Sequence, residues 1–286
     1  AAIDSSATDP WVIAAGYGNA YAVCLDSTDG EIQVDFYNIS NSGTALTALW
    51  SAELDTNTAS AETIKDVRTD GAGGIIVLYT YGSELRVQRI GTDSHYTPTV
   101  INRQWSTTGR LVTTSATLTD PVMTFDAIND AVLVVWVDGT TDIYTRRVAS
   151  TSSSVLQLTD LAASSQRLPS VFVDSAGTRA LVVWDDNRFV VNGGYSVFGV
   201  KLNIDTGTGA ISKNTAWNAN ASGGTDDTNG VAIIHHNFNE DCTYPLLFSA
   251  NNNSSVYLFW TDYETSANGS DQFYINPLVQ PYLPAW

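Results

Sequence analysis

The sequence predicts an all-β fold made of five successive, four-stranded antiparallel sheets. A proline precedes a tryptophan by 15 positions in three places, at Pro121–Trp136, Pro169–Trp184 and Pro245–Trp260. In several copies, another tryptophan lies 26 positions after the residue that ends this proline-led spacing, as Trp286 does after Trp260. Two markers that keep one spacing indicate a repeat of about 50 residues. Short runs of β-forming residues separate these markers, and four short strands per repeat are typical of a β-propeller blade.

Each copy is expected to contain a proline-led strand, a strand with an aromatic end, an alternating strand and an outer strand. The unit is clearest at Pro169–Asp174, Arg179–Trp184 and Tyr195–Leu202, where Gly177 allows the first turn. One domain is predicted over residues 1–286, with blades at 10–55, 63–114, 120–163, 168–217 and 243–286 and an insertion at 218–241. The last strand, Pro281–Trp286, contains prolines, which suit an outer edge. A β-sandwich with coincidental spacing is the alternative fold.

The insertion interrupts an otherwise regular pattern. Long segments inside compact domains are usually functional or mobile. We therefore expect Trp217, His235 and His236 to be candidate binding residues, and Val231–Ile234 to form an extra strand.

The composition favours a secreted protein and excludes two classes of partner. The 286 residues carry a formal net charge of −17, with 30 acidic and 13 basic side chains. Such a surface repels phosphate backbones and anionic lipids, so nucleic-acid binding is not expected. No apolar run reaches the length of about 18 residues that a membrane helix needs. The small, polar start at Ala1 suits a cleaved signal peptide, which predicts an extracellular or cell-surface location.

The two cysteines leave two alternatives open. Cys24 ends the second strand of the first blade, and Cys242 lies just before the first strand of the fifth. Blades one and five are neighbours in a closed ring, so a disulfide between these residues would hold the ring shut and imply an oxidising compartment. The alternative is two unpaired thiols, with Cys24 buried where other blades have tryptophan.

Metal chemistry has little support in the sequence. The three histidines lack metal-binding spacing, so no transition-metal cofactor is predicted. Oxygen-rich loops suit calcium, and the candidate ligands are Asp185, Asp186, Asp226 and Asp227. Turn chemistry explains these aspartates equally well.

Two resemblances to known families add to this picture. The pattern P-x-V-x-x-D followed by LVVW-x-D, and then by a strand such as DIYTRRV or SVFGVKL, resembles the blade repeat of secreted bacterial β-propeller proteins. It covers blades three and four well and implies a fold rather than a function.

The second resemblance is to five-bladed, arabinanase-like glycoside hydrolases. The start of the first blade, Asp9-Pro10-Trp11-Val12, is similar to the start of their first strand, which carries the catalytic base. That family has a glutamate acid in its third blade, and this chain has no glutamate there, so Asp120 would have to replace it. Asp9, Asp66 and Asp120 each lie near the start of a first strand and are the candidate catalytic carboxylates.

The leading interpretation is a propeller that acts by binding or structural assembly. Its partner would be a polysaccharide, a surface protein or further copies of the chain, and no cofactor is required beyond the calcium alternative. The second interpretation is a glycoside hydrolase-like enzyme with carboxylates at the propeller axis.

Overall fold

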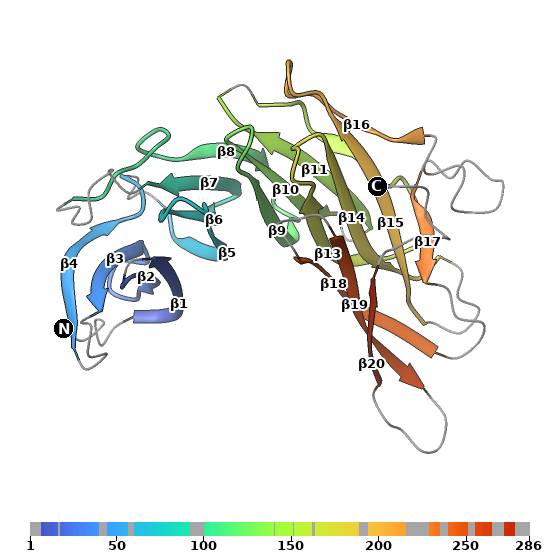
Figure 1. The fold of residues 1–286 in the computed structure, drawn as a ribbon, viewed down its shortest axis with the longest axis horizontal. Helices are drawn as coiled ribbons and strands as arrows, with labels where there is room; N and C mark the ends of the chain where they lie inside the picture. Colours follow the sequence, from blue (N-terminus) through green and yellow to red (C-terminus); the bar gives the residue numbers. More distant parts are fainter. Residues whose placement is uncertain are drawn as a thin grey trace. The chain divides into compact units, whose positions relative to one another are not determined.

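The computed structural model confirms an all-β chain with the five successive sheets of a five-bladed propeller (Figure 1). It describes residues 7–16, 18–39, 45–56, 60–91, 100–139, 141–150, 152–161, 164–188, 194–215, 229–234, 240–250, 255–264 and 272–277. The chain divides into two compact units, residues 1–116 and 117–286, which are taken separately below. The prediction of one domain over the whole chain stays a prediction.

The first unit contains two antiparallel sheets whose strands pair in chain order. The first sheet, blade one, consists of β1 (Ala7–Gly16), β2 (Asn19–Asp26), β3 (Ile32–Ile39) and β4 (Leu46–Glu53). The second sheet, blade two, consists of β5 (Glu62–Thr69), β6 (Ile75–Tyr81), β7 (Glu84–Ile90) and β8 (Arg110–Thr114).

The second unit contains three antiparallel sheets. Blade three consists of β9 (Thr119–Asp126), β10 (Ala131–Asp138), β11 (Asp142–Val148) and β12 (Leu156–Gln157). Blade four consists of β13 (Gln166–Val173), β14 (Arg179–Asp186), β15 (Ser196–Ile204), β16 (Ile211–Lys213) and β17 (Val231–Ile234). Blade five consists of β18 (Glu240–Ala250), β19 (Ser255–Glu264) and β20 (Gln272–Pro277).

The extra strand predicted in the insertion is confirmed. It is β17, and it pairs antiparallel with β15, so blade four has five strands rather than four. The predicted final strand Pro281–Trp286 lies outside the described residues.

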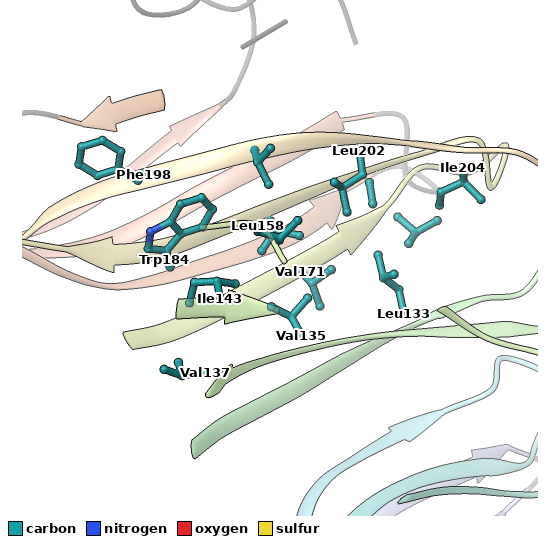
Figure 2. Packing of buried hydrophobic residues seen from close by; sticks show 14 residues of the cluster. Leu133, Val135, Val137, Ile143, Leu158, Val171, Trp184, Phe198, Leu202 and Ile204 are labelled. Atoms are coloured by element: carbon teal, nitrogen blue, oxygen red, sulfur yellow. The ribbon is translucent and has the colours of Figure 1, made fainter. Parts of the chain in front are cut away.

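Neighbouring sheets pack face to face within each unit. β10 reads AVLVVWV, and all seven of these side chains are buried, as expected for a strand covered on both faces. Side chains of β10, β11, β13, β14 and β15 form one core between blades three and four, with Trp184 and Phe198 toward one end and Leu202 and Ile204 toward the other (Figure 2). Separate cores lie between blades one and two and between blades four and five.

Each first strand contains a bulge opposite its second strand. In four blades the residue at the bulge has a positive φ, namely Asp9 (49°), Asp120 (48°), Leu168 (50°) and Tyr244 (56°). Each of these residues directly precedes a proline. Proline cannot donate to the strand ladder, so it is tolerated where a bulge has already broken the pairing. The bulge bends the strand and so changes the direction of the side chains near the start of each first strand.

The predicted Cys24–Cys242 disulfide is not present in the structure. Cys24 is 2% exposed on β2, and Cys242 is 0% exposed in the core between blades four and five. Cys24 and Cys242 belong to different units, so their pairing across a closed ring stays a prediction. Within the described residues, no helix has the length and apolar character needed to cross a membrane.

Candidate functional site

The first strands of the second unit lie side by side, and they bring several polar and aromatic side chains together. Asp120 on β9 is exposed, and its carboxylate Oδ2 accepts a hydrogen bond of 3.2 Å from the backbone N–H of Leu168 on β13. One blade further on, the hydroxyl of Ser170 accepts a hydrogen bond of 2.9 Å from the backbone N–H of Leu247 on β18. The three first strands are therefore linked directly, and their bulges occupy equivalent places.

An arginine stacked on a tyrosine lies beside the bulge of blade four. The guanidinium carbon of Arg167 is 3.7 Å from the ring centroid of Tyr195, and its Nε donates to Oδ2 of Asp185 at 3.3 Å. The Arg167 side chain is 39% exposed, whereas that of Asp185 is fully buried. The ring and the carboxylate therefore fix the guanidinium while leaving one side of it open to solvent.

Blade five adds an exposed aromatic side chain to this group. The backbone N–H of Cys242 donates to the carbonyl oxygen of Tyr195 at 2.9 Å, which places the beginning of β18 beside that tyrosine. Tyr244 follows two residues later and is 57% exposed. We name Asp120, Arg167, Tyr195 and Tyr244 the strand-start face of the second unit. It offers a carboxylate, a guanidinium and aromatic rings from the starts of three neighbouring blades. Such groups can stack on a ligand ring and hydrogen-bond its polar groups.

The structure separates the three predicted catalytic aspartates by environment. Asp9 is exposed at the bulge of β1, and Asp120 is exposed at the equivalent bulge of β9. Asp66 is 3% exposed on β5 and forms an ion pair of 2.9 Å with Arg68. Asp66 therefore has a structural partner and is poorly placed to reach a substrate. The convergence of Asp9 with Asp120 stays a prediction, because they belong to different units.

Two of the predicted calcium ligands form ion pairs with arginines. Asp185 and Asp186 are both 0% exposed. Asp186 accepts hydrogen bonds from Trp184 Nε1 at 3.1 Å and from Arg188 Nε at 3.0 Å, and Asp185 pairs with Arg167. This geometry disfavours calcium at these two residues, since each charge is already compensated inside the protein. The other candidates, Trp217, Asp226, Asp227, His235 and His236, lie outside the described residues.

A group of carboxylates that could hold a metal lies elsewhere, in the first unit. Ligand oxygens of Asp29, Glu31 and Glu53 all lie within 4.8 Å of one another, with Glu31 buried and the other two exposed. Two further acidic side chains, Asp55 and Glu62, are buried next to them. We name these five residues the acidic seam, because they lie where blade one meets blade two.

Burial and mutual repulsion raise the pKa of two glutamates in the acidic seam. Burial, together with the nearby charges of Glu53 and Asp29, raises the pKa of Glu31 above its ordinary value. Burial also raises the pKa of Glu62 to about 8, with Asp55 contributing. Both shifts show that the folded chain gathers negative charge here at a cost.

Of the strand-start face, sequence reasoning found only Asp120, and it missed the acidic seam. Asp29-Gly30-Glu31 was interpretable only as a turn, and Arg167 and Tyr195 lie 28 positions apart with no shared motif. The one available signal for Tyr244 was its place before a proline that starts a first strand.

Comparison with known proteins gives similarities of fold at low sequence identity. No protein-family model and no curated protein matches the chain. A protein from Lactobacillus plantarum with a known crystal structure is 13% identical in sequence. The match covers 95% of this chain and 71% of that chain, with a TM-score of 0.49. The GH93 α-L-arabinofuranosidase of Fusarium graminearum, in complex with arabinobiose, is 9% identical over 98% of this chain and 83% of its own, with a TM-score of 0.48. An endo-arabinase from Bacteroides thetaiotaomicron is 10% identical over 97% and 96%, with a TM-score of 0.41.

Proposed function

We propose that the protein binds carbohydrate at the strand-start face of its second unit. The observation that carries this proposal is the grouping of exposed Tyr244 with the Arg167–Tyr195 stack and the exposed carboxylate of Asp120. The partner classes that the sequence leaves open, a surface protein or further copies of the chain, become alternative outcomes of the test.

The chemistry of this face suits a sugar better than an apolar or anionic ligand. A tyrosine ring covers the apolar face of a pyranose or furanose, while carboxylate and guanidinium groups hydrogen-bond adjacent hydroxyls. The guanidinium is already held by Asp185 and Tyr195, so little conformational entropy is lost when a ligand binds. The net charge of −17 disfavours polyanions. A neutral polysaccharide is the expected ligand class.

Retention on immobilised neutral polysaccharides of plant, algal and bacterial origin tests the proposal. Tyr244→Ala should weaken retention about two- to tenfold, because one aromatic contact is worth ~0.5–1.5 kcal/mol. Ile128→Ala is a suitable control, since Ile128 is 69% exposed in the hairpin at the other end of β9. Equal retention of Tyr244→Ala and the unchanged protein would contradict binding at this face.

Glycoside hydrolysis is the second candidate function. It is supported by the exposed carboxylates of Asp9 and Asp120, which occupy the same place in the first strands of blades one and three. The resemblance to arabinanase-like enzymes gives the first of these residues the role of base. Two carboxylates with separate roles are what glycoside cleavage needs.

Release of soluble sugars distinguishes hydrolysis from binding. Asp9→Asn and Asp120→Asn keep the size of the side chain, and an asparagine at 120 can still accept the hydrogen bond from Leu168. If the protein is a hydrolase, each change should lower the rate of sugar release by at least a hundredfold while retention persists. Sugar release that survives both changes would exclude these two carboxylates as the catalytic pair.

A further inference from the structure

The Arg167 side chain of the strand-start face is held in one orientation by groups of blade four. The register of β13 and β14 sets Arg167 directly opposite Asp185, and its Nε donates to Oδ2 of that buried carboxylate at 3.3 Å. The ring of Tyr195 covers one face of the guanidinium, with 3.7 Å between the guanidinium carbon and the ring centroid. The Nε edge and one face of this planar group are therefore occupied.

The groups that hold Arg167 are themselves fixed by hydrogen bonds. The carbonyl oxygen of Tyr195 accepts the N–H of Cys242 at 2.9 Å, which ties it to the beginning of β18. The N–H of Ser165, just before β13, donates to Oδ1 of Asn187, just after β14, at 2.7 Å. The conformational entropy of this arginine is therefore lost on folding rather than on ligand binding, which favours affinity.

The two terminal nitrogens of Arg167, Nη1 and Nη2, are left for a ligand. In the part of the chain that the structure describes, the hydrogen bond from Nε to Asp185 is the one hydrogen bond that this side chain donates. The side chain is 39% exposed, and neither terminal nitrogen is enclosed as a buried atom without a partner. A guanidinium carries its N–H groups in a rigid planar fork, and four of the five belong to the terminal nitrogens.

The charges around this fork favour a hydroxyl group over a carboxylate as its ligand. The ion pair with Asp185 offsets the charge of Arg167. The exposed carboxylate of Asp120 accepts the N–H of Leu168, the next residue along the chain. An anion would thus meet a compensated guanidinium in a chain of net charge −17, whereas a hydroxyl oxygen accepts a hydrogen bond without bringing further negative charge.

We propose that Arg167 is the specificity-determining residue of the strand-start face, and that its fork binds two adjacent free hydroxyl groups of one neutral sugar. This inference rests on the proposed binding of carbohydrate and names the feature of the ligand that the site recognises. Two neighbouring donors in one plane match two neighbouring acceptor oxygens, so both hydrogen bonds can form together. The exposed ring of Tyr244 stacks on sugars in general, whereas Arg167 discriminates among them by their hydroxyl groups.

O-methylation of the ligand tests the proposal without changing the protein. Three neutral probes, dextran, galactomannan and laminarin, are compared before and after methylation of their free hydroxyl groups, by retention and by titration calorimetry. Methylation should weaken binding of the best-retained probe about tenfold or more, because methyl groups on adjacent oxygens keep the planar fork away from both and remove hydrogen bonds to a charged donor. Tighter binding of polygalacturonate than of every neutral probe would overturn the assignment to hydroxyl groups.

Arg167→Lys locates the discrimination in the protein. Lysine keeps a positive charge for Asp185 but has no fork, so affinity for the unmodified probe should fall about tenfold. The variant should also lose most of the discrimination against the methylated probe, which a merely structural role of Arg167 would leave unchanged. Arg179→Lys is the matched control, since it makes the same exchange at another arginine of blade four, paired with Asp174. It should bind like the unchanged protein, and denaturant unfolding checks that both variants fold.

The outcomes separate this inference from the proposed function. Weaker binding by Tyr244→Ala, with full discrimination kept in Arg167→Lys, would leave carbohydrate binding in place and overturn the role of Arg167. Equal binding of methylated and unmodified probes by the unchanged protein would overturn that role without any variant. Retention of none of the neutral probes would contradict carbohydrate binding itself, and this inference with it.

Discussion

Two regions of this protein bury carboxylates, and they compensate the charge in opposite ways. In blade four, each buried carboxylate has its own guanidinium, Arg167 for Asp185 and Arg188 for Asp186. In the acidic seam, buried Glu62 lies beside the carboxyl groups of Asp55 and Glu31, and a side-chain hydrogen bond joins it to Asp55. The comparison teaches that burial alone does not define a metal site. What distinguishes the seam is that its carboxyl groups lie beside one another, so that burial and neighbouring carboxylates raise the pKa of Glu62.

The largest effect should come from breaking the internal compensation in blade four. Arg188 is 8% exposed, and it also covers the ring of Phe198, with its guanidinium carbon 4.1 Å from the centroid. Arg188→Ala would leave Asp186 charged and buried, which should lower the free energy of unfolding by ~3–5 kcal/mol. Denaturant unfolding measures this loss. Adding Asp186→Asn should recover part of it, and a loss below about 1 kcal/mol would show that Asp186 does not depend on Arg188.

A smaller effect should follow from pH in the acidic seam when no metal is present. The pKa of Glu62 is raised by burial from its ordinary value of 4.5 to about 8, so the folded chain holds a proton that the unfolded chain has lost between these pH values. The stabilising contribution is complete below about pH 4.5 and is lost as the pH rises through about 8, on the order of 2 kcal/mol after solvent screening.

Unfolding in chelator-containing buffers from pH 5 to 8 measures this effect. Glu62→Gln carries no titrating group, so its stability should vary less with pH than that of the unchanged protein. Identical pH profiles for the two proteins would show that Glu62 keeps an ordinary pKa. The carboxylates of the acidic seam would then not differ from those of blade four in how their charge is compensated.

The smallest effect should come from another arginine–aspartate pair of blade four, whose carboxylate is less buried. Arg179 and Asp174 form an ion pair of 2.9 Å, with side chains 35% and 10% exposed. Burial alone would raise the pKa of Asp174, but hydrogen bonds from Arg179 and from the backbone N–H of Thr178 outweigh it and lower the pKa. The contribution of this pair is therefore present above the ordinary value of 3.8 and is lost as the pH falls below it.

Arg179→Ala should accordingly cost only ~0.2–1 kcal/mol at neutral pH. The pKa of Asp174, followed by NMR titration, should rise in this variant. A loss as large as that expected for Arg188→Ala would mean that burial is not what separates the two pairs.

The sequence by itself determined the blades. Proline and tryptophan markers, alternating strands and turn residues are local features, and each follows from backbone preference or from burial of a strand on both faces. The extra strand Val231–Ile234 was predictable for the same reason, since it is a short run of β-forming residues. The pairing of Cys24 with Cys242 could not be decided from the sequence, because it depends on how distant strands are placed.

Only the tertiary structure decided which side chains meet. Glu31 and Glu62 come together because the β2–β3 hairpin of blade one and the start of β5 in blade two exchange hydrogen bonds. The N–H of Glu62 donates to Gly30, and the N–H of Ile32 donates to the carboxylate of Glu62, and no spacing in the chain encodes that contact. In the sequence, Asp185 and Asp186 resemble metal ligands. In the structure, the strand register places Asp185 opposite Arg167, and both aspartates are buried. Strand formation is governed by residues a few positions apart, whereas the charge around a carboxylate is governed by register and blade packing.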